Sequence, residues 1–298
     1  MGKASRQKRQ GSVRERIAAQ QAAERRTVVR NRILAWSAVV VVIAVVVAFI
    51  AIKLSNNGGK AAASTLPTGA ALSKITSGAT SVPPATLDAV GAGAVQTPVT
   101  KLSGQPPLTK NGKPEVVYVG AEYCPFCAAE RWAMAVSLSQ FGTFSNLGVT
   151  HSDTSDVFPN TKTLTFYKSS YSSDHVVFSP VETTDPTKKN LQTPSSEEQA
   201  LVAKYDAPPY VPSQSQGSIP FVDIGNKYLI SGASYSPAIL QGKSWSQIAA
   251  ALHDPSSPIA KGAVGTANMI SAAICKTTGN QPSNVCTSKA VTAAEGKL

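Results

Sequence analysis

Hydrophobic positions divide the chain into one long apolar segment near its start and a larger region of short alternating elements. Residues 33–52 are twenty consecutive residues without a charge, mostly valine, isoleucine and alanine. As a helix they would span about 30 Å, the thickness of the hydrocarbon core of a bilayer. A cleaved signal peptide has a shorter apolar region of about 7–15 residues. The pattern therefore predicts one uncleaved transmembrane helix.

Beyond this segment, runs with the period of a strand alternate with runs that suit helices. This alternation predicts an α/β domain. Strands are expected at residues 116–119, 147–151 (a weak one), 161–167 (half-buried), 176–181 (an edge or a broken strand, because of Pro180) and 221–224. The last should form a hairpin with 227–230 through Gly225-Asn226. Helices are expected at residues 128–140, from Ser195 or Ser196 to 205, from the cap Ser244 through 245–252, at 263–275, and from the cap Ser283 to 293.

Charge is concentrated at the start of the chain. The formal net charge is +11, and residues 1–32 hold ten Lys or Arg and two Glu, which is +8 and leaves +3 for the rest. This distribution indicates a basic, solvated cytoplasmic tail that sets the membrane topology, rather than a nucleic-acid-binding face. Contact of the tail with anionic lipid headgroups is an alternative. We thus expect a tail at 1–32, the anchor at 33–52, a flexible linker rich in Gly, Ala and Ser at 53–75, and an extracytoplasmic domain at 76–298.

Candidate chemistry follows the strand at 116–119, in the sequence Cys124-Pro125-Phe126-Cys127. Pro125 suits a first helical turn, so Cys124 should lie at a helix N-terminus. The free amides and dipole there stabilise a thiolate, and in known C-x-x-C sites the pKa falls from about 8.5 to about 3.5–7.5. We expect an exposed Cys124 to attack a disulfide and a more buried Cys127 to resolve the mixed disulfide.

Other uses of these cysteines are less consistent with the sequence. Haem attachment needs a histidine after the second cysteine, where Ala128 stands. Zinc sites need four suitably spaced ligands, and the three histidines are scattered. We expect no metal and no cofactor, although a disulfide without turnover remains an alternative.

The four cysteines suit an oxidising compartment. The expected pairs are Cys124–Cys127 and Cys275–Cys286. The second pair should be structural, because closing a loop of this length stabilises by about 3 kcal/mol, with a redox relay to the first pair as the remaining alternative.

Several neighbours of the two cysteines are candidate auxiliary residues. Tyr123 and Phe126 would offer apolar contacts to a polypeptide substrate. Glu122 and Glu130 are carboxylates that could shuttle the proton of Cys127, although a solvated position is expected for Glu130.

Residues 112–132, with Phe141-Gly-Thr-Phe after them, closely resemble the domain-of-unknown-function family 929, which is membrane-anchored and thioredoxin-like. The resemblance covers roughly residues 75–295. It implies a thioredoxin-like fold in which Cys124 and Cys127 are the redox pair and Ile219-Pro220 supplies a cis proline that shapes the substrate groove. An ordinary trans proline that begins a strand is the alternative. The long segment between Cys127 and Pro220 implies an insertion.

Together these observations predict a membrane-tethered, extracytoplasmic thiol–disulfide oxidoreductase that acts on protein cysteines. A non-catalytic thioredoxin-like binding or scaffold domain at the cell surface is the alternative. A membrane-bound redox partner is a further expectation that the sequence does not test.

Overall fold

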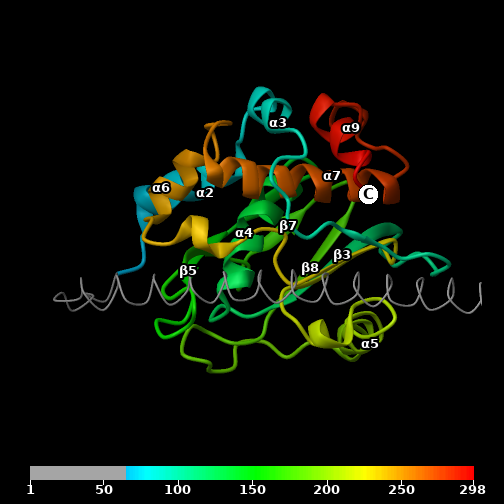
Figure 1. Cartoon of the computed structure of the whole chain (residues 1–298), viewed down its shortest axis with the longest axis horizontal. Coiled ribbons are helices and arrows are strands. Elements are labelled where there is room, and N and C mark those ends of the chain that lie inside the picture. Colours follow the sequence, from blue (N-terminus) through cyan, green and yellow to red (C-terminus); the bar gives the residue numbers. More distant parts are fainter. Residues whose placement is uncertain (1–64) are drawn as a thin grey trace, which may run out of the picture. The chain divides into compact units, whose positions relative to one another are not determined.

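The computed structural model describes residues 65–298 (Figure 1). The expected basic tail and transmembrane helix, at 1–32 and 33–52, lie outside the described residues. Within residues 65–298, no helix combines the length and the apolar character needed to cross a bilayer. The first helix within the described residues, α2 (Gly69–Thr80), begins inside the expected linker, so the prediction of a flexible segment is wrong from Gly69 to residue 75. Ile75 and Ala79, one turn apart, give this helix a buried face.

A mixed sheet forms the centre of the domain and confirms the predicted α/β class. Its strands run in the order β1-β10-β9-β3-β2, and β8 also pairs with β3. The central strand β3 is parallel to β8 and antiparallel to β9. The strands are β1 (Thr100–Lys101), β2 (Thr109–Lys110), β3 (Lys113–Gly120), β8 (Val177–Glu182), β9 (Phe221–Ile224) and β10 (Tyr228–Ser231). The predicted edge strand and the predicted hairpin are both present, as β8 and as β9–β10.

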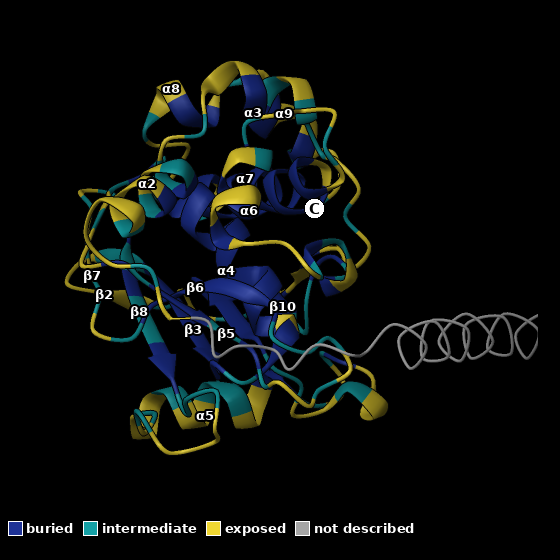
Figure 2. Ribbon diagram, turned by 90° about the vertical axis from the view of Figure 1, so that its left-hand side faces the viewer, coloured by how far each residue is buried: buried dark blue, intermediate teal, exposed yellow. Residues whose placement is uncertain are grey.

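Helices cover the two faces of this sheet unequally, as Figure 2 shows. Val116 and Tyr118 of β3 face the main core, which contains the buried helix α4 (Pro125–Leu138). Val117 and Val119 face a smaller cluster beneath α5 (Ser196–Tyr205). The other helices in the described part of the chain are α3 (Pro84–Val90), α6 (Trp245–Ala251), α7 (Gly265–Thr277) with a π-helical segment before it (Ala260–Val264), α8 (Ser283–Cys286), α9 (Lys289–Glu295) and the 3₁₀ turns Ser213–Ser215 and Pro237–Leu240.

Two small sheets occupy the chain between α4 and β8. They pair β4 (Thr143–Ser145) with β7 (Ser170–Ser172), and β5 (Gly148–His151) with β6 (Lys162–Thr165). All four β6 residues are buried, so the prediction of a half-buried strand is wrong. Helix α4 covers one face of the β5–β6 sheet, where Thr163 Oγ1 donates to Ala128 O. On the other face, the ring of Trp245 in α6 lies beside Lys162.

Helix caps follow the predicted chemistry in the middle of the chain and depart from it at the end. Ser195 and Ser244 each cap a helix through a reciprocal capping box. The predicted last helix is instead split into α8 and α9, with Ser288 as the cap of α9 and Ser283 as the first helical residue of α8. The break lies just after Cys286, which forms the predicted disulfide with Cys275 of α7.

Candidate functional site

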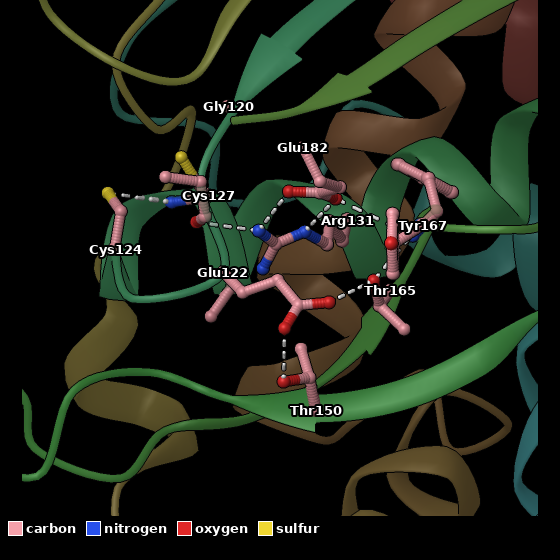
Figure 3. Close-up of polar contacts among 12 residues, drawn as sticks. Gly120, Glu122, Cys124, Cys127, Arg131, Thr150, Thr165, Tyr167 and Glu182 are labelled. Carbon is pink, nitrogen blue, oxygen red and sulfur yellow. Dashed lines mark hydrogen bonds and ion pairs between the residues drawn. The ribbon is translucent and has the colours of Figure 1, made fainter. Parts of the chain in front are cut away.

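The turn between β3 and α4 carries the two cysteines, and the local sequence explains its shape. Pro125 is the first residue of α4, and Cys124 is its N-cap in an extended conformation. The Cys127 amide donates to Cys124 Sγ at 3.3 Å (Figure 3). The sulfur therefore occupies the place of a capping oxygen, where helix amides favour negative charge.

Cys124 is less accessible than predicted from the sequence. Its exposed fraction is 5%, and Cys127 is fully buried. The segment before β9 lies against Cys124, whose Sγ donates to Ile219 O at 3.7 Å. The Ile219-Pro220 bond is cis, as the resemblance implied, and Pro220 is buried. The two sulfurs are separate thiols rather than the expected disulfide, so the structure represents the reduced form of the pair.

The two thiols differ in acidity. The pKa of Cys124 is lowered, chiefly by a hydrogen bond with the Cys127 side chain, and the Cys127 amide adds to this effect against the opposing effect of burial. Burial raises the pKa of Cys127 well above its ordinary value. Cys124 is therefore the more acidic thiol, and a thiolate is the nucleophilic form of cysteine.

Gly120, the last residue of β3, leaves the space that the buried thiol and a tyrosine occupy. A Cβ at Gly120 would collide with the Tyr118 hydroxyl and would lie 3.1 Å from Cys127 Sγ. The Tyr118 hydroxyl is buried without a hydrogen-bond partner among the described residues. Burial raises its pKa well above the ordinary value, so it stays a neutral phenol.

An ion pair that the sequence analysis missed lies behind the cysteines. Arg131 of α4 and Glu182 of β8 are both fully buried, and the Nε–Oε1 and Nη2–Oε2 distances are each 2.7 Å (Figure 3). The spacing from Cys127 to Arg131 is i, i+4, which places both on one helix face and could have indicated the arginine. Glu182 reaches the site because β8 runs parallel to β3, with Gly120 opposite Glu182.

Neither candidate proton shuttle forms a hydrogen bond with Cys127. The Glu122 carboxylate accepts from Thr150 Oγ1 at 3.0 Å and from Thr165 Oγ1 at 2.5 Å (Figure 3). Glu130 is fully buried, so its expected solvated position is wrong. Its carboxylate accepts from the amide and hydroxyl of Ser234, in the loop after β10, which docks there on α4.

A loop of the inserted region, residues 152–161, borders the cysteines. The Asp153 amide donates to Tyr123 O at 2.8 Å. The Phe158 ring meets the Phe126 ring edge to face, with centroids 5.9 Å apart. Phe126 is 39% exposed and Val157 is 61% exposed. Large apolar side chains are therefore accessible in the cysteine motif, at Phe126, and in the bordering loop, at Val157.

A further contact, made by Lys188, fixes the same loop against Tyr123. Lys188 Nζ lies 3.2 Å from Asp153 Oδ2 and also sits above the Tyr123 ring. Tyr123 is half-buried as a result. Across residues 65–298, no three His, Cys, Asp or Glu side chains gather as the ligands of a metal ion would.

Comparison with known proteins gives one family. No curated protein and no solved structure matches the chain. The model of a domain of unknown function, DUF929, matches residues 98–276, which include Cys124, Cys127, Arg131, Glu182 and Pro220. Because the match covers more than half of the sequence, the chain belongs to the DUF929 family.

Proposed function

We propose that the chain is a membrane-tethered, extracytoplasmic thiol–disulfide oxidoreductase acting on protein cysteines. One observation carries the proposal: Cys124 Sγ caps α4 at 3.3 Å from the Cys127 amide and contacts Ile219 O beside the cis Pro220. A low-pKa sulfur next to a second, buried thiol is the arrangement that disulfide exchange requires.

We further propose that the domain is thioredoxin-like. Three features support this assignment: the C-x-x-C helix α4 directly follows the central strand β3, β3 lies between parallel β8 and antiparallel β9, and a cis proline precedes β9. On this assignment, the insertion inferred from the sequence corresponds to the two small sheets between α4 and β8.

In the proposed reaction, the Cys124 thiolate attacks one sulfur of a substrate disulfide. A bond forms between Cys124 and that sulfur, and the other substrate sulfur leaves as a thiolate. Cys127 then loses its proton and attacks Cys124 Sγ, which expels the second substrate thiolate and leaves a Cys124–Cys127 disulfide. The substrate is reduced by two electrons and the protein is oxidised by two; the reverse sequence makes a disulfide in the substrate.

The surroundings of Cys124 favour a polypeptide as substrate. Phe126, between the two cysteines, has an exposed ring that meets the Phe158 ring of the bordering loop, and a peptide side chain can cover this apolar surface. The Cys275–Cys286 disulfide agrees with an oxidising compartment, and the basic tail and apolar segment of the sequence support the membrane attachment. A membrane-bound redox partner would regenerate the pair.

The test is turnover of a disulfide-containing polypeptide by the purified full-length chain, together with trapping by Cys127→Ser. This variant keeps the attacking sulfur but lacks the resolving one, so it should accumulate mixed disulfides through Cys124. Cys124→Ser should trap nothing. A wild-type chain that neither turns over the substrate nor exchanges with a glutathione redox buffer would refute the proposal.

The alternative, a binding or scaffold domain without turnover, is favoured by one observation. Cys124 is only 5% exposed, so a bulky disulfide must displace neighbouring side chains to reach it. Under this alternative, Cys127→Ser would trap no partner, while binding of a partner would survive replacement of both cysteines.

A further inference from the structure

The buried ion pair of Arg131 and Glu182 has no role in the exchange steps above. Both side chains are fully buried, and two hydrogen bonds of 2.7 Å join them. Burying two charges costs several kcal/mol per ion, and replacing such a pair with uncharged residues is often neutral or stabilising. Stability alone is therefore a weak reason for a pair at this position.

Arg131 contacts the turn that carries Cys124. Its Nη2 donates to Ala121 O at 2.7 Å, and the same carbonyl accepts the Cys124 amide at 3.2 Å. The guanidinium thus fixes the main-chain turn that places Cys124 at the start of α4. Its second terminal nitrogen, Nη1, is buried and has no hydrogen-bond partner among the described residues.

The charge of Arg131 also acts on both sulfurs. After the larger effects of hydrogen bonding and burial, it lowers the pKa of Cys124 and that of Cys127. Burial disfavours the charged guanidinium and is the largest single effect on its pKa. The Glu182 carboxylate, Tyr118 and Cys127 together outweigh burial and raise the Arg131 pKa, so the arginine stays protonated. The ionisable groups around the sulfurs are Tyr118 on β3, Glu122 and Tyr123 in the β3–α4 turn, Arg131 on α4, Glu182 on β8, and Lys188 above the Tyr123 ring.

We infer that Arg131 is a positioning residue for the cysteine pair: it holds the Ala121–Cys124 turn and favours the Cys124 thiolate, and Glu182 limits how strongly its charge acts on the sulfur. The role in exchange rests on the proposed function. The effect on thiol ionisation does not, because it is a property of the free chain.

The experiment measures how fast iodoacetamide alkylates Cys124 as a function of pH, in the full-length chain in detergent micelles, with the modified residue identified by mass spectrometry. Arg131→Met with Glu182→Gln removes both charges at similar volume. We expect the midpoint of its rate–pH profile to rise by at least about half a pH unit, a threefold loss of thiolate below the midpoint. Glu182→Gln alone leaves Arg131 uncompensated, so its midpoint should fall instead.

The matched control is Lys276→Met with Glu295→Gln, which removes a partly exposed ion pair of 2.9 Å between α7 and α9 and should leave the profile unchanged. The opposite shifts of the two test variants separate an electrostatic role from a structural one, because a loosened turn would not lower the midpoint. An unchanged profile in the charge-free double variant overturns the inference. If that variant does not fold, the isosteric Glu182→Gln decides, and a midpoint that fails to fall overturns it.

No substrate is present in this measurement. If the midpoints of both test variants shift as expected but the wild-type chain shows no turnover, the proposed function is refuted and the inference about Arg131 stands. If the wild-type chain turns over substrate but the midpoints do not shift, the inference is refuted and the proposed function stands.

Discussion

Glu130 is expected to make the stability of the domain depend on pH. Its carboxyl group is fully buried in α4, and burial raises its pKa from 4.5 to about 7, against the opposing effect of its hydrogen bonds from Ser234. Between these two values the folded chain binds a proton that the unfolded chain has lost. Stability from this group is therefore complete below about pH 4.5 and declines as the pH rises through 7.

The size of the effect follows from the two pKa values. One pKa unit corresponds to about 1.4 kcal/mol, so the change from 4.5 to about 7 is worth about 3 kcal/mol. Glu130→Gln has the same shape, stays neutral, and can still accept from the Ser234 amide. Its free energy of unfolding should equal that of the wild type near pH 4.5 and exceed it by about 3 kcal/mol at pH 8.

Urea denaturation at a series of pH values, followed by the fluorescence of the buried Trp132 and Trp245, measures this difference. Asp223 offers a comparison, because burial also raises its pKa to about 7. Asp223→Asn should remove a separate part of the wild-type pH dependence and leave the part due to Glu130. A gap between Glu130→Gln and the wild type that is constant from pH 4.5 to 8 would show that Glu130 does not titrate in this range.

Three further outcomes are expected. Gly120→Ala should destabilise the chain by about 1–3 kcal/mol in urea denaturation, because its Cβ meets the Tyr118 hydroxyl. Gly296→Ala should have little effect, because the nearest atom to its Cβ, Ala293 O at 3.7 Å, is at an ordinary van der Waals distance. Replacing Cys275 and Cys286 by serine should cost about 3 kcal/mol in the same assay, and an unchanged urea midpoint would argue against a structural role. Phe126→Ala should raise KM for a polypeptide disulfide but not for a small disulfide. The free energy of unfolding should change by less than about 1 kcal/mol, because the ring is 39% exposed. An equal rise in KM for both substrates would count against a peptide-binding role.

Local patterns were enough to predict the elements that carry the site. The strand β3, the start of α4 at Pro125 and the β9–β10 hairpin follow from β-branched runs, a proline and an Asn turn, all of which act over a few residues. The same holds for the helix caps Ser195 and Ser244. The last helix was predicted less well, because the competing cap at Ser288 divides it.

The sequence by itself determined that Cys124 begins a helix and that Cys127 lies one turn further on, because capping and the helical period depend only on neighbouring residues. Only the tertiary structure decided what surrounds those sulfurs. Three contacts define these surroundings: Ile219 covers Cys124, Ser234 docks on Glu130, and Arg131 pairs with Glu182. The residues in each contact lie 51 to more than 100 positions apart in the sequence. Contacts at such separations depend on how strands pair and how helices pack, and no local spacing in the chain encodes them.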